Sequence, residues 1–233
     1  MRRLVVLVAV LGCAGATAAP GAGDRRVAVI GRSSEGRPIK AVEVGDSAAR
    51  VKVLVVGCIH GNEQAGIAVA RRLEQITPPQ GIDLWIVPVL NPDGVAADTR
   101  QNAHGVDLNR NFPWRWRDLE GIYDSGSRPL SEPEARAARR LILRVRPTIS
   151  IWYHQHLDLV DESGGSVAVE RRYARLTRLP LERLLRYPGS VVNWENDVLP
   201  GSTAFVVELP AGRLSPAATE RHTRAVLALA GRR

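Results

Sequence analysis

The sequence predicts an α/β protein, namely a single-domain α/β/α sandwich built around a central mixed β-sheet. Two observations support this fold class. Short apolar segments alternate with segments of helical periodicity along most of the chain, as expected when helices cover both faces of a sheet. The 233 residues, 45% of them hydrophobic, show no internal repeat and no linker, so they suit one domain with a sizeable core.

The first half of the chain is expected to supply most of the sheet. Residues 33–38 are rich in turn formers and join two short apolar segments, which predicts a hairpin. Residues 51–57 form a continuous apolar run, which is typical of a central strand covered on both faces. The strands expected here are 27–30, 39–44, 51–57 and 84–90, and residues 64–75 are expected to form a helix.

The second half continues the alternation after a long polar stretch, residues 91–130. Long loops of this kind in a compact domain usually have a function. Ser131 and Glu134 have the spacing of a capping box, which predicts a helix through residue 144. Further strands are expected at 148–153 and 203–209, and further helices within 169–178 and at 215–230.

The N-terminus has the form of a signal peptide over residues 1–18, which leaves a domain at 19–233. A short basic start precedes an apolar run at residues 4–11, and Ala16-Thr17-Ala18 is a small-x-small cleavage site. The apolar run is too short to span a bilayer, so we expect no transmembrane span. The protein is therefore expected to be exported, either periplasmic or extracellular.

The two cysteines bear on the same question. Residues 10–13 resemble a bacterial lipobox, which leaves a lipid anchor at Cys13 open as an alternative. Cys13 is lost with the signal peptide or lipidated, so Cys58 is the only thiol left in the mature chain. No disulfide within that chain is then expected.

The chain is strongly basic, with a formal net charge of +8. Only Lys40 and Lys52 are lysines, so 30 of the 32 basic residues are arginines, spread along the chain without interleaved aromatic residues. This distribution argues against a nucleic-acid groove and favours a solvated basic surface. An exported basic protein would still be attracted to anionic cell-wall polymers. We expect a monomer.

His60 and Glu63 follow the central apolar strand and lie three residues apart on one loop. Imidazole nitrogen and carboxylate oxygen are both ordinary zinc ligands, at about 2.0–2.2 Å, so this pair can converge on one cation. A catalytic zinc site needs a third protein ligand and one open position for water. On its own the pair is a weak signal.

The wider pattern is far more specific. Its parts occur in a fixed order: His60 and Glu63, Arg100, the block Gly-Val-Asp-Leu-Asn-Arg-Asn-Phe at 105–112, a His at the end of a strand, and Glu208 in a final strand. This order resembles the zinc carboxypeptidases of the carboxypeptidase A type, over nearly the whole mature chain. The compact length and the segment 152–157 are most similar to the bacterial murein peptide amidases, which cut cell-wall peptides.

The resemblance implies a role for each matching residue. One zinc ion per chain is bound by His60, Glu63 and His154, with His156 as the rival third ligand. Glu208 is the general base, and Arg100 stabilises the oxyanion. Asn109 and Arg110 hold the terminal carboxylate of the substrate, for which the planar fork of arginine is suited.

Four polar residues and one missing tyrosine complete the expectations for the site. Asp93 and Asp107 are expected to be structural in turns, His104 to make a loop hydrogen bond, and His222 to lie on a solvated helix face. Digestive carboxypeptidases have a mobile tyrosine before the strand of the catalytic glutamate. The matching position here is approximately Asn196, which argues against ordinary trimming of protein C-termini.

The function expected from the resemblance is an exported zinc peptidase or amidase that cuts an amide bond next to a free terminal carboxylate, the γ-D-glutamyl-diaminopimelate bond of murein peptides. Asp158 or Asp161 would then read the distal ammonium of diaminopimelate. The alternatives are a general metallocarboxypeptidase, an N-acyl amino acid hydrolase of the desuccinylase and aspartoacylase type, and a non-catalytic wall-binding module. The last would be expected to have lost Glu208 or a zinc ligand, and all are present.

Overall fold

The computed structural model describes residues 25–231. The expected signal peptide at 1–18, the start of the mature domain at residue 19 and the alternative anchor at Cys13 all lie outside the described residues. Within them, no helix is both long and apolar enough to cross a membrane.

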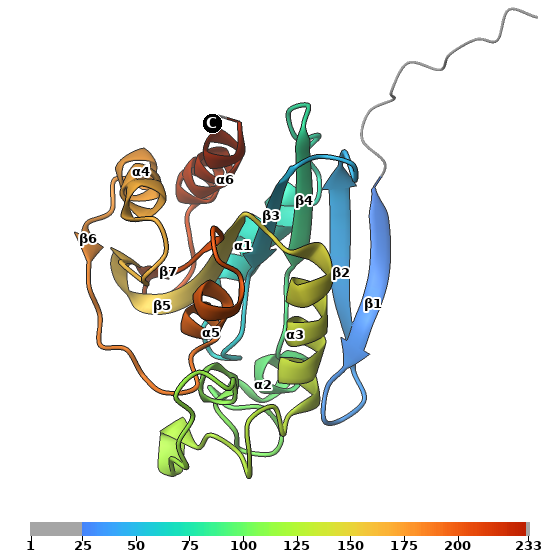
Figure 1. The fold of residues 1–233 in the computed structure, drawn as a ribbon, viewed down its shortest axis with the longest axis vertical. Coiled ribbons are helices and arrows are strands. Elements are labelled where there is room, and N and C mark those ends of the chain that lie inside the picture. Colours follow the sequence, from blue (N-terminus) through green and yellow to red (C-terminus); the bar gives the residue numbers. More distant parts are fainter. Residues whose placement is uncertain (1–24, 232–233) are drawn as a thin grey trace, which may run out of the picture.

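A mixed sheet forms the centre of the molecule (Figure 1). Its strand order is β1-β2-β4-β3-β5-β6, and β7 pairs with β5. β1, β2 and β4 pair antiparallel, whereas β3, β4, β5, β6 and β7 pair parallel. The strands are β1 (Arg26–Arg32), β2 (Pro38–Gly45), β3 (Val51–Val56), β4 (Ile82–Val87), β5 (Ile149–Asp161), β6 (Leu181–Glu182) and β7 (Thr203–Pro210).

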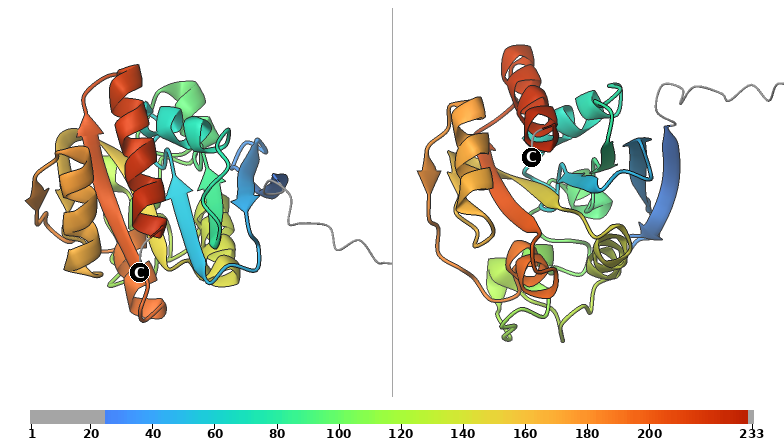
Figure 2. Two further views of the ribbon diagram at one scale, coloured as in Figure 1. Left: turned by 90° about the horizontal axis from the view of Figure 1, so that it is seen from above. Right: turned by 45° about the horizontal axis from the view of Figure 1, so that its top comes forward.

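Helices cover both faces of this sheet, so the structure is the predicted α/β/α sandwich (Figure 2). On one face, α1 (Ala65–Leu73), α4 (Val167–Thr177) and α6 (Pro216–Ala230) pack against a core that includes Val53, Tyr153 and Phe205. On the other face, α3 (Pro133–Val145) and α5 (Val191–Val198) enclose a second core around Trp152. Burying the apolar residues of β3 from both sides explains its uninterrupted apolar sequence.

Several boundaries differ from the expectations. β5 does not stop before His154 but continues to Asp161, because β7 stays paired with it up to Pro210. Its register against β7 shifts between His156 and Leu157, next to a cis peptide bond between Gln155 and His156. β4 ends at Val87, three residues earlier than expected.

The capping box at the start of α3 is also wrong. The N-cap residue is Glu132, and it makes no side-chain capping bond. Its carboxylate instead accepts a hydrogen bond from the hydroxyl of Ser131, in the loop before the helix. The last helix does begin as expected, since Ser215 Oγ accepts a hydrogen bond from the backbone N–H of Ala218 at 3.1 Å.

The long polar stretch lies beneath the sheet in Figure 1 and contains short helices that its composition did not indicate. They are α2 (Pro92–Ala97), η1 (Leu108–Arg110) and η2 (Gly121–Tyr123). The block at 105–112 is its most buried part, with Val106, Leu108 and Phe112 at most 4% exposed. The loop is therefore anchored by its own apolar side chains.

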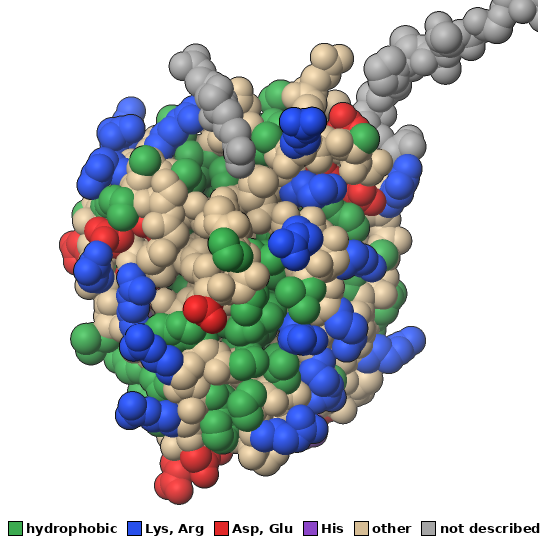
Figure 3. Space-filling model, in the orientation of Figure 1, with side chains coloured by type: hydrophobic (Ala, Val, Ile, Leu, Met, Phe, Trp, Pro, Cys, Tyr) green, Lys and Arg blue, Asp and Glu red, His purple; other side chains and the backbone are tan. Residues whose placement is uncertain are grey.

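On the face shown in Figure 3, Lys and Arg side chains are distributed widely and lie more densely on the right, over α3 and the neighbouring strands. Cys58, the only cysteine among the described residues, is free and buried.

Candidate metal centre and substrate cleft

The site is assembled after the end of β3, beside the middle of β5 and near the end of β7. His60 and Glu63 lie in the turn between β3 and α1, where the backbone N–H of Glu63 donates to the carbonyl of His60 at 3.0 Å. A side chain on Gly61 would collide with α2, because a Cβ built there would lie 1.9 Å from the carbonyl carbon of Gly94. Glycine at this position therefore lets the turn pack directly on the long loop.

His60, Glu63 and His154 direct three ligand atoms at one point. The Nδ1 atoms of the two histidines are 3.1 Å apart, and each lies 2.9 Å from Oε2 of Glu63. Bonds of about 2.0 Å at tetrahedral angles would separate zinc ligands by about 3.3 Å. The three atoms therefore have nearly the spacing of one face of such a site, and they are the only such His, Cys, Asp or Glu group among the described residues.

The chemistry of these atoms fits a cation. His60 donates through Nε2 to Asp107 Oδ1 at 2.9 Å, which leaves the lone pair of its Nδ1 facing the other two ligand atoms. Burial alone would raise the pKa of Glu63, but His60 and His154 lower it far below its usual range. The triad thus offers two imidazole nitrogens and one ionised carboxylate, a donor set that suits zinc.

Asp107 is the functional residue that the sequence reasoning missed. It does cap η1, accepting from the N–H of Asn109 at 2.8 Å, but the same carboxylate also holds His60 and Arg100. Burial alone would raise the pKa of Asp107, yet His60 and then Arg100 and Arg110 lower it well below its usual range. Its position inside the specific block at 105–112 was the available signal.

Arg100 is fixed by two carboxylates. Its Nε donates to Asp107 Oδ2 and its Nη1 donates to Glu63 Oε1, both at 2.9 Å. Among the described residues, one N–H of Nη1 and both N–H groups of Nη2 have no acceptor, so they are left for a substrate oxygen. The arginine therefore orients Glu63 in addition to any contact it makes with substrate.

Glu208 lies next to His154 because the register of β5 and β7 pairs these two residues. In parallel strands, paired residues point to the same face of the sheet. Oε2 of Glu208 is buried and has no hydrogen-bond partner among the described residues. A carboxylate so placed can accept a proton from a group bound beside the triad.

Arg110 and Asn109 line the same cleft. Arg110 is 5% exposed, donates from Nη1 to the carbonyl of Asn109 at 2.8 Å, and comes no closer than 4.0 Å to Asp107. The Oδ1 of Asn109 accepts from the N–H of Val191 at 2.9 Å, and its Nδ2 has no hydrogen-bond acceptor within residues 25–231. Both residues thus keep donors for an anionic group.

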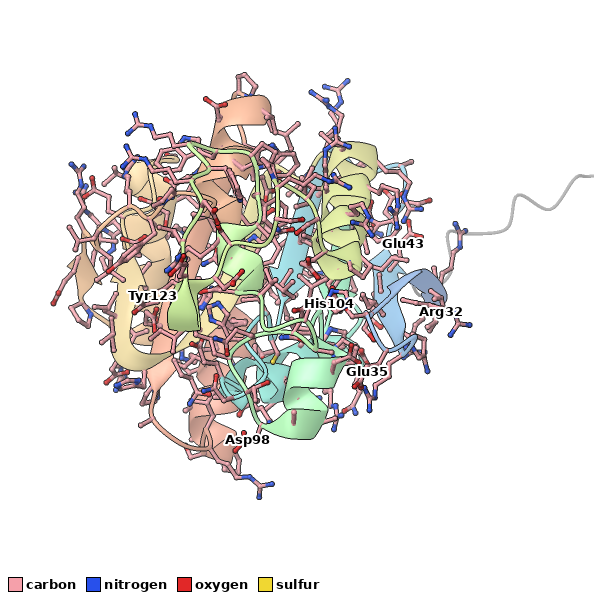
Figure 4. The ribbon with its side chains drawn as sticks, turned by 90° about the horizontal axis from the view of Figure 1, so that it is seen from below. Arg32, Glu35, Glu43, Asp98, His104 and Tyr123 are labelled. Atoms are coloured by element: carbon pink, nitrogen blue, oxygen red, sulfur yellow. The ribbon has the colours of Figure 1, made fainter. Side chains whose placement is uncertain are left out.

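The rings of Tyr123 and Tyr187 lie over the guanidinium of Arg110, and that of Tyr123 also lies near Arg100. The Tyr123 and Tyr187 rings stack at 5.9 Å, and the Arg110 guanidinium lies 4.4 Å from the centre of the Tyr187 ring. Tyr123 is labelled in Figure 4, which looks onto this edge of the molecule from below. The aromatic pair shields the guanidinium, which strengthens any charge pairing made there.

The cleft has a volume of about 340 Å³. It contains every sequence-predicted site residue: His60, Glu63, Arg100, Asn109, Arg110, His154 and Glu208. Its wall on the β6 side is made by residues that the sequence did not indicate, namely Leu184, Leu185, Arg186, Tyr187, Ser190, Val192 and Asn193.

The match of the family's tyrosine position to Asn196 does not hold in the structure. Asn196 does not line the cleft but exchanges hydrogen bonds with the backbone of Ala204, at 2.8 and 2.9 Å. Tyr187 lines it instead, from the connection between β6 and α5. Asn196 therefore gives no reason to exclude trimming of protein C-termini.

The remaining histidines lie outside the triad. His156 is exposed, and His104, labelled in Figure 4, makes the expected loop hydrogen bond through Nδ1 to Glu132 at 2.7 Å. The solvated position expected for His222 is wrong: it is 1% exposed, and its Nδ1 lies 2.9 Å from the hydroxyl of Tyr173. A histidine in a helix can face the core as readily as solvent when a buried hydroxyl is available.

Comparisons with known proteins agree with this geometry. A family model described as zinc carboxypeptidase matches residues 23–160. Murein peptide amidase A of Escherichia coli (strain K12) is 31% identical over 184 residues, which cover 72% of this chain and 75% of the relative. Murein peptide amidase A of Vibrio campbellii is 31% identical over 194 residues, which cover 76% of each chain.

Solved structures give the same result at the level of the fold. The murein-tripeptide amidase of Escherichia coli O157 has a TM-score of 0.71 at 28% identity, covering 92% of this chain and 94% of that one. Carboxypeptidase A of Helicoverpa armigera has a TM-score of 0.73 at 20% identity, covering 88% and 69%. The second likeness concerns the fold alone.

Proposed function

The chain belongs to the zinc carboxypeptidase family, and from that premise we propose that it hydrolyses the γ-D-glutamyl-diaminopimelate bond of murein peptides outside the cytoplasm. It is a zinc-dependent hydrolase of the carboxypeptidase and amidase type. The observation that carries the substrate proposal is the presence of Arg110 in the same cleft as the triad and Glu208. A buried guanidinium with free donors selects a substrate that ends in a carboxylate.

In this proposal His60, Glu63 and His154 hold the zinc ion, and Asp107 and Arg100 orient its ligands. Zinc in such a site acts as a Lewis acid and lowers the pKa of a coordinated water towards about 7. Glu208 accepts the proton of the attacking water while the water oxygen bonds to the amide carbon. The same carboxyl then delivers the proton to the nitrogen as the carbon–nitrogen bond breaks.

The other residues position the substrate. Arg100 Nη2 faces the negative charge that develops on the amide oxygen. Arg110 and the Nδ2 of Asn109 hold the terminal carboxylate, and the rings of Tyr123 and Tyr187 exclude water from that contact. The expected leader at 1–18 supports export, which would bring the enzyme to its substrate.

The test uses the purified zinc-loaded protein and three peptides: murein tripeptide, its C-terminal amide, and a plain peptide with a hydrophobic C-terminus. Fragments are identified by mass spectrometry. Hydrogen bonds to a charged partner contribute about 1.5–3 kcal/mol, so amidation should lower kcat/KM roughly 10- to 150-fold. Arg110→Lys should cause a similar loss, because an ammonium cannot form two parallel hydrogen bonds.

The contrary outcome is equally clear. Fastest cleavage of the plain peptide would mean a general carboxypeptidase. Since a tyrosine lines the cleft, that alternative has a structural basis and needs this direct comparison. Cleavage of N-acyl amino acids in preference to all three peptides would indicate an acylase.

A further inference from the structure

The β6 side of the cleft contains two opposite charges that form no ion pair within the described chain. Asp161 and Arg186 both line the cleft, and neither lies within 4.0 Å of an oppositely charged side chain there. Their neighbours differ: Arg183 and Glu162 pair with each other. Arg186 is exposed and Asp161 is half-buried, so both charges are accessible to a ligand that carries the opposite charges.

Asp161 is held in a fixed orientation by neutral donors. Its Oδ1 accepts from the N–H of Leu184 at 2.9 Å, and its Oδ2 accepts from the hydroxyl of Ser163 at 2.7 Å. Each carboxylate oxygen keeps a second lone pair, so the group can still accept hydrogen bonds from an ammonium. Asp158, the other acidic residue considered from the sequence, is exposed and does not line the cleft.

Arg186 reaches the same end of the cleft by lying against Gly164. A Cβ built on Gly164 would lie 2.7 Å from Arg186 Nη1, and the backbone there has a φ of +97°. Glycine is therefore required both for the turn and for this approach. Gly164 follows Asp161 by three residues, so the guanidinium lies near the end of β5 with its donors uncommitted in the described chain.

Asn193 adds a third polar group. It is 8% exposed and lines the cleft from α5, and its side-chain amide has no hydrogen-bond partner among the described residues. A ligand that covers this amide without hydrogen-bonding to it would leave a polar group buried and unpaired, which costs free energy. A polar ligand would avoid that cost.

We propose that this end of the cleft selects a terminal residue whose side chain carries both an ammonium and a carboxylate, with Asp161 binding the ammonium and Arg186 the carboxylate. This inference rests on the proposed function, because it assigns the side-chain pocket of the same substrate. Arg110 binds the other carboxylate, the one next to the scissile amide. Two separate arginines thus account for the two carboxylates of a diamino dicarboxylic acid.

The experiment uses four γ-D-glutamyl dipeptides that differ only at the distal end of the last residue. meso-Diaminopimelate has both groups, lysine has the ammonium alone, 2-aminopimelate has the carboxylate alone, and norleucine has neither. The kcat/KM of each is measured for the wild type, Asp161→Asn, Arg186→Gln and the control Arg183→Gln. Arg183 pairs with Glu162 outside the cleft, so its variant should match the wild type on all four.

Asp161→Asn should lower kcat/KM for diaminopimelate and lysine about 10- to 100-fold and leave 2-aminopimelate and norleucine unchanged. Arg186→Gln should lower kcat/KM for the diaminopimelate and 2-aminopimelate dipeptides. It should leave kcat/KM for the lysine and norleucine dipeptides unchanged. An equal loss on all four dipeptides, or no loss on any, would overturn the assignment.

The binding of the four free amino acids, measured by calorimetry, makes the same comparison without turnover. If the wild type cuts none of the γ-linked dipeptides, the proposed function fails. The pocket assignment is then still decided by whether Asp161→Asn and Arg186→Gln weaken the binding of the matching amino acids. The two failures are therefore distinguishable.

Discussion

His60 and Asp107 are joined by a buried hydrogen bond in which the imidazole Nε2 donates to Oδ1 across 2.9 Å. The aspartate sets the tautomer of the histidine and aims its Nδ1 at Glu63 and His154. Partners of this kind raise the basicity of a metal ligand and hold its ring in place. We therefore propose that Asp107 positions the ligands of the metal centre.

Replacing Asp107 by Asn should weaken zinc binding about 10- to 100-fold, because the amide removes the negative charge that favours His60 as a ligand. Zinc affinity is measured by competition with a chelating dye. The matched control is Asp93→Asn, the same change at a buried aspartate that binds Ser33 and Arg37 in the hairpin. Equal zinc affinity of wild type and Asp107→Asn would contradict the role.

The third zinc ligand can be decided by a pair of alanine variants. His154→Ala should lose most of the metal, because its Nδ1 is one of three converging atoms. His156→Ala should keep it, since that side chain is exposed. The zinc content of each purified variant is measured by mass spectrometry after dialysis, and exchanged outcomes would mean that the ligand is His156.

Glu208→Gln should keep the fold and the zinc ion yet lower kcat about 10²- to 10⁴-fold, the usual contribution of a general base. Its Oε2 has no partner among the described residues, so the amide can occupy the same space. Circular dichroism and zinc content serve as controls. A catalytic rate equal to that of the wild type would assign the proton transfer to another group.

Local patterns predicted the fold class, whereas the resemblance to the zinc carboxypeptidases named the seven residues that the structure places in one cleft. Apolar runs bury strands, and residues that follow parallel strands meet at one edge. What the sequence missed depends on pairing between distant segments. The extension of β5 needs β7 beside it, and Asp107 becomes a partner of His60 only when the long loop folds beneath β3.

Tyr187 illustrates the same limit. Counting along the chain pointed to Asn196, but a connection between β6 and α5 carries the aromatic ring to Arg110. Connections of this kind have no periodicity by which to place a side chain. The burial of His222 is likewise invisible in the sequence, because it depends on the hydroxyl of Tyr173.

His222 should make the folded protein sensitive to acid. Burial lowers the pKa of His222 to about 4, whereas an unfolded histidine has a pKa of about 6.5. The unfolded chain therefore binds the extra proton between about pH 6.5 and 4, and stability falls as the pH falls through this range. The total loss is on the order of a few kcal/mol.

His222→Asn should flatten the dependence of folding stability on pH in this range. The Asn Oδ1 can still accept a hydrogen bond from Tyr173, but the amide does not bind a proton. Urea unfolding at several pH values, in the presence of chelator, measures the difference from wild type. His156→Asn makes the same change at an exposed position and should retain the wild-type slope. Parallel profiles for wild type and His222→Asn would contradict this reading.

Asn102 should hold the long loop that carries one wall of the cleft. Its Nδ2 donates to the buried carboxylates of Glu132 and Glu134, at 2.8 and 3.1 Å, and its Oδ1 accepts from the N–H groups of His104 and Val106, both at 3.1 Å. Burial alone would raise the pKa of Glu132, but hydrogen bonds from Asn102, Ser131 and His104 lower it. One amide thus bridges two buried carboxyl groups.

Asn102→Ala should destabilise the protein by about 3 kcal/mol or more, since two buried carboxylates lose a shared donor. KM should also rise, because Arg100 and Arg110 lie on the same loop.

Asn102→Asp keeps the acceptor but places a third carboxylate beside Glu132 and Glu134, so at pH 8 it should be less stable than Asn102→Ala. Repulsion raises the pKa of the cluster in that variant, so its stability should recover relative to Asn102→Ala as the pH falls from 8 to 5. Urea unfolding at the two pH values measures both effects, and a variant Asn102→Asp as stable as wild type at pH 8 would show that the loop is held by other contacts.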